Sequence, residues 1–309
     1  MVNPTRILLI LSVVCWLTAA MTGDTRASEF SRAGADSCLL CHRETSEFPA
    51  TAIFDTPHAA RLDPEAPFAQ LQCESCHGPS EDHAMAERHG EFVAPGRVFG
   101  TNSPTPAQTQ NEVCITCHET HGRLGWFGSR HEAAQVSCAS CHQIHRAQDR
   151  VFNALAQQEA CFTCHAKRRA DTFKASSHPL RFGEMSCSSC HDPHNGNNDF
   201  LLRESTVNET CYTCHAEKRG PFLWEHAPAS ENCTLCHQPH GSNHPVLLTR
   251  RPPLLCQQCH SAAGHPAVAY GEDDISNNFS NRFLLSRACL NCHSQVHGSN
   301  HPSGATLHR

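Results

Sequence analysis

The hydrophobic pattern of the chain contains one long apolar run, which lies near its beginning. The run extends over 7–21, follows Arg6, and is succeeded by Thr25-Arg26-Ala27. It has about 15 residues, which is short for a membrane-spanning helix of roughly 20. A basic residue, a short apolar run and a small-residue cleavage site are typical of an export signal. We therefore expect residues 1–27 to be a signal peptide and residues 28–309 to form the exported domain. A retained N-terminal anchor is the alternative.

Beyond this run, neither a helical nor a strand pattern continues for long. No alternation of apolar and polar residues persists, so little or no β-structure is expected. Gly, Pro, Ser and Asn gather in clusters that favour turns, for example over 96–106 and 241–245. No other segment is apolar for long enough to cross a membrane as a helix. The pattern predicts coil with short α-helical turns.

The composition does not provide an ordinary hydrophobic core. Hydrophobic residues make up 39% of the chain, but this figure includes 21 cysteines. Without cysteine the share falls to about 32%, below the share usual for globular domains. Charged residues are 17% and the formal net charge is −6, which argues against a disordered chain and against nucleic acid as a partner. Something other than side chains has to fill the interior.

The cysteines show what fills it. Apart from Cys15 in the signal, every cysteine belongs to a C-x-x-C-H motif, and this motif occurs ten times. The motif cysteines are Cys38 and Cys41, Cys73 and Cys76, Cys114 and Cys117, Cys138 and Cys141, Cys161 and Cys164, Cys187 and Cys190, Cys211 and Cys214, Cys233 and Cys236, Cys256 and Cys259, and Cys289 and Cys292. The motif is the attachment signature of c-type haem, in which two thiols bind one porphyrin.

The histidine that ends each motif separates haem from two alternatives. Redox-active or structural disulfides do not require a histidine after the second cysteine. Zinc ribbons need two cysteine pairs for each metal ion. We therefore expect ten covalent haems, which would supply the missing core. Their proximal iron ligands are His42, His77, His118, His142, His165, His191, His215, His237, His260 and His293.

The remaining histidines reveal an internal repeat of five dihaem modules. In the first four modules, a Phe and then a His follow the odd-numbered motif, and a second His trails the even-numbered motif. One histidine from each position gives ten distal-ligand candidates: His58, His83, His131, His145, His178, His194, His226, His240, His265 and His297. Five histidines are counted as spare: His89, His121, His244, His301 and His308. The fifth module is irregular, and His244 and His301 compete with His240 and His297.

A histidine three positions after a proximal ligand cannot reach the far face of its own porphyrin. It must serve a neighbouring iron, although the sequence does not show which one. The exported domain retains two Met residues, Met85 and Met185, so paired His ligation is expected, and it gives lower potentials than Met/His ligation. Haems so closely spaced along the chain should touch. The predicted fold class is a multihaem cytochrome c, an elongated haem-cored chain of mostly coil and short α-helices.

Several of these features resemble the decahaem cytochromes of the DmsE/MtrA type. The resemblance rests on the export signal, the ten motifs, Cys-Glu-Ser-Cys-His77-Gly-Pro-Ser and the repeated Cys-His-x-Pro-His, and it covers the exported domain. It implies a periplasmic haem wire that inserts into an outer-membrane β-barrel porin and exchanges electrons with the cell exterior. The implied partners are that porin, a periplasmic or inner-membrane quinol-linked cytochrome, and an extracellular cytochrome or metal oxide.

Three functions remain open from the sequence. The first is an electron-transfer conduit without a substrate, because ten plausible distal ligands leave no iron vacant. The second is a soluble periplasmic electron shuttle or store. The third is a multihaem reductase, which needs an open iron site that nothing in the motifs indicates. We expect an electron carrier and not an enzyme.

Overall fold

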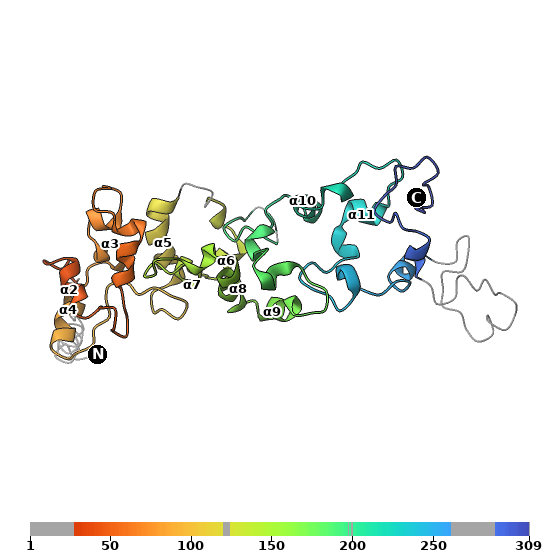
Figure 1. The fold of residues 1–309 in the computed structure, drawn as a ribbon. Coiled ribbons are helices and arrows are strands. Elements are labelled where there is room, and N and C mark those ends of the chain that lie inside the picture. The colour runs from red at the N-terminus through yellow and green to blue at the C-terminus, as the bar shows by residue number, and fades with distance from the viewer. Residues whose placement is uncertain (1–27, 120–123, 197, 199, 261–287, 309) are drawn as a thin grey trace, which may run out of the picture. The chain divides into compact units, whose positions relative to one another are not determined.

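The computed structural model describes residues 28–119, 124–196, 198, 200–260 and 288–308. Over these residues the chain is coil interrupted by short helices (Figure 1). The α-helices are α2 (Ala35–Leu39), α3 (Cys73–His77), α4 (Glu81–Arg88), α5 (Ala107–His118), α6 (Arg130–Ala133), α7 (Cys138–Cys141), α8 (Ala154–Phe162), α9 (Ala166–Thr172), α10 (Val207–Tyr212) and α11 (Ala227–Glu231). The 3₁₀-helices are η1 (Thr51–Asp55), η2 (Pro57–Ala59), η3 (Pro67–Ala69), η4 (Leu124–Trp126), η5 (Arg150–Phe152), η6 (Pro179–Phe182), η7 (Cys187–Ser189), η8 (Ala216–Lys218), η9 (Cys233–Leu235), η10 (Pro245–Leu247), η11 (Cys256–Gln258) and η12 (Cys289–Asn291). The expected export signal, His121 and His265 lie outside the described residues.

β-structure within the described residues is limited to isolated antiparallel bridges. These join Ser176 to Ser242, His191 to Leu202, Trp224 to Ser299, and His237 to Leu248. Short helices, coil and repeated C-x-x-C-H modules match the fold class expected from the sequence, so that prediction is confirmed.

The helices that carry the fifth and seventh motifs, α8 and α10, begin at side-chain caps. The Asn153 side chain accepts hydrogen bonds from the first backbone N–H groups of α8, and Thr206 accepts one at the start of α10. Each cap satisfies N–H groups that lack a partner inside the helix. Both helices end within the motif, so capping places the first cysteine in their last turn.

The described polypeptide buries few apolar side chains. They are Ala35, Ala66, Phe68, Trp126, Ala160, Leu201 and Leu248. Buried polar side chains are more numerous, and large apolar side chains such as Phe152 and Phe182 are 83% and 71% exposed. The described chain therefore lacks a conventional core of its own, as its composition predicts.

The chain divides into two compact units, residues 1–98 and 99–309. In the first unit, the buried Glu74 carboxylate accepts the backbone N–H of Ser31 at 3.0 Å and that of Ser80 at 2.9 Å. These hydrogen bonds fasten an earlier segment and the N-cap of α4 to the second motif. A buried carboxylate is satisfied in this way without a basic partner.

Candidate haem-binding sites

Each C-x-x-C-H motif folds into one helical turn. In eight motifs the histidine N–H donates to the carbonyl of the first cysteine at 2.8–3.0 Å; these histidines are His42, His142, His165, His191, His215, His237, His260 and His293. The other two motifs lie in α3 and at the end of α5. Residues at positions i, i+3 and i+4 share one face of a helical turn. The turn therefore presents both thiols and the imidazole together, as one porphyrin requires.

All twenty motif cysteines are described, and none of them forms a disulfide. In the described part of the chain, no three His, Cys, Asp or Glu side chains are grouped to hold a metal ion.

Buried amides hold the two motifs of a module together. The Asn208 Oδ1 accepts the backbone N–H of Cys233 at 2.8 Å, while its Nδ2 donates to the carbonyls of Ala229 and Ser230. Asn111 makes the same bond to the N–H of Cys138 at 2.7 Å. Asn111 and Asn208 both stand three residues before the first cysteine of an odd-numbered motif. No sequence motif had singled out these two residues, although their repeated position three residues before a motif was a usable signal.

Thiols of successive motifs lie next to one another. Within modules, the pairs are Cys38 with Cys73, Cys161 with Cys187, Cys211 with Cys233, and Cys256 with Cys289. A hydrogen bond from the partner thiol raises the pKa of Cys38 and of Cys161, whereas burial is the main cause for Cys211 and Cys256. Between modules, the charges of Cys164, Cys214 and Cys259 add to burial in raising the pKa values of Cys141, Cys190 and Cys236. From the fourth motif to the tenth, neighbours in sequence are thus neighbours in space.

Six pairs of imidazole rings lie at a nearly constant centre-to-centre separation. The ring centres of His42–His83, His131–His165, His142–His194, His191–His240, His226–His260 and His237–His297 lie 6.1, 6.3, 6.0, 5.9, 6.1 and 6.2 Å apart. Two metal–imidazole bonds of about 2 Å, plus about 1.1 Å from each ring centre to its Nε2, require about 6 Å. Every pair joins one proximal histidine to one distal candidate. The described side chains therefore fit irons with two histidine ligands.

The paired histidines are oriented through their other nitrogen. The proximal His191 and His237 have Nδ1 atoms 2.8 and 2.9 Å from the carbonyls of Phe200 and Val246. Among distal candidates, the His83 Nδ1 lies 2.6 Å from the Val93 carbonyl. An Nδ1–H that donates to a carbonyl leaves the Nε2 lone pair for a metal. These contacts fix the tautomer that iron ligation needs.

In the second, third and fourth modules, the upstream histidine is held by a backbone carbonyl of the next module. The Nδ1 atoms of His131, His178 and His226 lie 3.1, 2.9 and 2.8 Å from carbonyls of the residues just before His194, His240 and His297. Two bridges reinforce this contact, because Ser176 pairs with Ser242 and Trp224 pairs with Ser299. The modules of the second unit are therefore interlocked and are not independent beads.

Burial keeps several of these imidazoles neutral. It lowers the pKa of His240 to about 4 and also lowers the pKa values of His58, His77, His165 and His297. A neutral imidazole retains the lone pair that binds iron, so burial prepares these side chains as ligands at neutral pH.

The structure differs from the sequence expectation at His308. This residue was counted as spare, but its Nε2 lies 3.3 Å from the Nε2 of the tenth proximal histidine, His293. His301, a competitor of His297, has the opposite tautomer, because its Nδ1 accepts the backbone N–H of Ser303 at 3.1 Å. A neutral imidazole that accepts at Nδ1 carries its proton on Nε2 and has no lone pair for iron. His244 competes with His240 in the sequence, and the ring that lies 5.9 Å from that of His191 belongs to His240.

For the other distal-ligand candidates, the assignment depends on their positions in the sequence repeat. His58, His145 and His178 are described, and His178 has the same anchor as His131 and His226. His265 lies outside the described residues.

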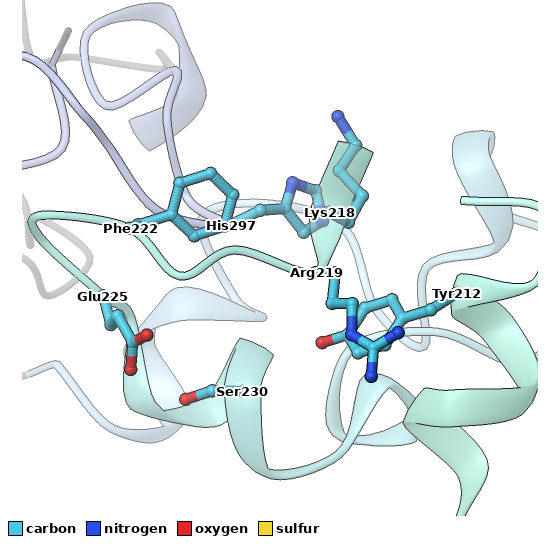
Figure 2. A pocket seen from close by; sticks show the side chains of 7 residues that line it. All are labelled: Tyr212, Lys218, Arg219, Phe222, Glu225, Ser230 and His297. Carbon is cyan, nitrogen blue, oxygen red and sulfur yellow. The ribbon is translucent and has the colours of Figure 1, made fainter. Parts of the chain in front are cut away.

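A small open hollow lies beside one of the paired histidines. Its empty volume is about 190 Å³, and it is lined by Tyr212, Lys218, Arg219, Phe222, Glu225, Ser230 and His297 (Figure 2). Phe222 is the aromatic residue four positions before His226 in the repeat. The hollow therefore adjoins the imidazole pair of His237 and His297.

Comparisons with known proteins agree with this geometry. A family model described as a doubled CXXCH motif matches residues 178–220 and 226–265, and one described as a cytochrome c-type protein NrfB-like matches residues 73–156. The multiheme cytochrome MtrA of Shewanella baltica is 49% identical over 282 residues, which cover 91% of this chain and 83% of that protein. The cytochrome c-type protein NrfB of Escherichia coli is 29% identical over 170 residues, 52% of this chain and 82% of NrfB. The C-type polyheme cytochrome OmcB of Geobacter sulfurreducens is 26% identical over 171 residues, 52% of this chain and 20% of OmcB.

The identity to MtrA extends over 91% of the chain. Together with the repeated C-x-x-C-H motifs, it establishes the cofactor class as covalently bound haem c. The chain belongs to the MtrA family of multihaem c-type cytochromes, which are electron-transport proteins.

Proposed function

We propose that the chain binds ten haems c, gives each iron two histidine ligands, and carries electrons along the resulting row. Haem c supplies a one-electron ferric/ferrous couple when bound. The observation that carries the proposal is the set of six imidazole pairs at iron-binding separation. Contacts between successive motifs support a continuous path from the fourth to the tenth.

The pairs of the second unit follow one rule. The histidine that trails an even-numbered motif is the distal ligand for the preceding even-numbered motif, as His194 is for the motif of His142. The histidine upstream in a module is the distal ligand for the next odd-numbered motif, as His131 is for the motif of His165. By this register His178 is assigned to His215. The tenth motif takes His308, and the first takes His83. His58 and His145 remain the distal candidates for the second and third motifs.

This assignment gives every iron two protein ligands and leaves no open coordination site for a substrate. The chain therefore acts as an electron carrier and not as a reductase. The test has two parts. Intact-mass spectrometry of the acid-denatured protein should show ten haem additions, about 6 kDa in total. Electron paramagnetic resonance of the oxidised protein should show low-spin iron, whereas a strong high-spin signal altered by nitrite or hydroxylamine would restore the reductase alternative.

The family resemblance supports a location in the periplasm, at the outer membrane, with a β-barrel porin as partner. No helix within the described residues is long and apolar enough to span a membrane. A hydrocarbon layer of about 30 Å insulates the two sides, and a large β-barrel with a polar interior is able to sheath a haem row across it. A periplasmic or inner-membrane quinol-linked cytochrome would exchange electrons at one end, and an extracellular cytochrome or metal oxide at the other.

Fractionation separates the conduit from the shuttle. In cells that express an adjacent porin, the cytochrome should co-purify with that porin from detergent-solubilised outer membranes. Recovery of the cytochrome wholly in the soluble periplasmic fraction of such cells would replace the conduit with a periplasmic electron shuttle.

A further inference from the structure

The fourth motif differs from the sixth and eighth in the group that its proximal histidine contacts. In those motifs, the Nδ1 of His191 and His237 faces a backbone carbonyl nine residues further along the chain. In the fourth motif, the Nδ1 of His142 lies 2.6 Å from the carboxylate Oδ2 of Asp149. The Asp149 side chain is 12% exposed, so water screens this contact only weakly.

Local structure holds Asp149 in place. Its second oxygen, Oδ1, accepts the backbone N–H of Val151 at 3.3 Å and so caps η5. The nearby Arg150 guanidinium donates to the Ser140 carbonyl at 3.4 Å. The carboxylate is therefore oriented toward His142 before any iron is bound. The short Nδ1–Oδ2 distance is typical of a charge-assisted hydrogen bond.

The distal side of the same site also carries a carboxylate. His194, whose ring centre lies 6.0 Å from that of His142, has its Nδ1 3.7 Å from the Asp192 Oδ1. This distance is longer than a hydrogen bond, and the Asp192 side chain is 41% exposed, so its influence is the weaker of the two. Both carboxylates nevertheless place negative charge at the fourth site.

We infer that Asp149 is a positioning residue that lowers the reduction potential of the fourth haem site relative to the sixth and eighth. A carboxylate that accepts the Nδ1 proton makes His142 a more electron-rich ligand, which favours ferric over ferrous iron. A neutral carbonyl exerts the same effect more weakly. Electrons that travel along the row therefore meet an energetic step at the fourth site. This inference rests on the proposed haem ligation.

The Asp149→Asn variant tests this inference. Asparagine keeps an Oδ1 acceptor for Val151 and an oxygen near His142, but it removes the charge. The ferrous state of one haem in ten should become about tenfold more favourable, which is an upward shift of about 59 mV for one electron. In a spectroelectrochemical titration, one-tenth of the haem absorbance change should shift to a higher potential. The low-spin ferric resonance of the same haem should change shape.

Three further variants separate charge from structure. Asp149→Glu restores the carboxylate and should titrate like the parent protein, while Asp149→Ser is a second neutral variant and should shift like Asn. Glu217→Gln is the control, because Glu217 lies 3.9 Å from the Nδ1 of His215 and is 61% exposed. It should leave every potential unchanged. The inference is overturned if Asp149→Asn and Asp149→Ser both leave all potentials unchanged. It is also overturned if Asp149→Glu or Glu217→Gln raises one potential as much as the neutral variants do.

Haem counting distinguishes this failure from failure of the proposed function. Each variant is first weighed intact. A parent protein with fewer than ten haems overturns the proposed function itself, whereas ten haems without the expected shift overturn the role of Asp149 alone.

Discussion

Replacing His308 with Ala should open the sixth coordination position of exactly one iron, that of the tenth motif. His293 already has the tautomer required of a ligand, because its Nδ1 lies 2.7 Å from the Thr306 carbonyl. Its Nε2 and that of His308 are 3.3 Å apart, while an iron bonded to both at about 2 Å needs about 4 Å. The two ring centres lie 4.1 Å apart, whereas an iron between them needs about 6 Å, so the His308 ring has to move away by about 2 Å to admit the metal.

The assay is quantitative electron paramagnetic resonance of the oxidised protein. His308→Ala should convert one iron in ten to a high-spin form while intact mass still shows all ten haems, because attachment depends on the cysteines. His308→Met should instead keep the iron low-spin and raise one potential, since Met/His ligation favours the ferrous state.

Two matched variants make the result decisive. His301→Ala should remain low-spin, because the Ser303 N–H occupies the His301 Nδ1 and leaves the proton on Nε2. His265→Ala should also remain low-spin, although the sequence repeat favours His265 as a ligand. A high-spin signal in His265→Ala combined with none in His308→Ala would refute this reasoning.

Three further predictions follow from the way the modules are joined. Asn208→Ala leaves the Cys233 N–H without its acceptor and removes the hydrogen bonds that Asn208 donates, so denaturant unfolding should show a loss of about 2–4 kcal/mol in the free energy of unfolding. Asn243→Ala, at an exposed residue, should leave this free energy unchanged. Gly241 has φ +140°, and an added Cβ would collide with the Asp171 carbonyl, so Gly241→Ala should make the bridge between Ser176 and Ser242 sensitive to proteolysis. Gly128→Ala, with φ +79° and open space around it, should have a smaller effect. His178→Met should raise the potential of one haem in a redox titration, whereas the exposed His89→Met should change none.

Local chemistry was readable from the sequence because it depends on residues close together in the chain. The C-x-x-C-H spacing closes one helical turn, so the twenty cysteines and ten proximal histidines needed no tertiary information. The scarcity of apolar residues likewise predicted that the polypeptide would not build a conventional core. The repeat revealed that trailing histidines are candidates for neighbouring irons, and the structure places His194 and His240 opposite His142 and His191.

Long-range contacts were not readable in the same way. The assignment of each distal histidine depends on how one module folds onto the next, as in the contact between the His178 Nδ1 and the Pro239 carbonyl. His308 lies outside the repeat register, so counting positions left it spare. No sequence motif singles out Asp149, and its contact with His142 becomes distinctive when it is compared with the carbonyl contacts of the sixth and eighth motifs.

The central claim, that electrons pass along one continuous row, is tested most directly by deleting a haem in the middle of it. The cytochrome and its porin partner would be reconstituted in liposomes that enclose a redox dye, and the rate of dye reduction by an external donor measured. Cys187→Ala combined with Cys190→Ala removes the sixth attachment site, and its product should be confirmed as carrying nine haems. The account predicts that the rate falls to the level of liposomes containing the porin alone, because the fifth and seventh sites no longer have a neighbour between them. A rate reduced by merely about one-tenth would contradict a continuous row.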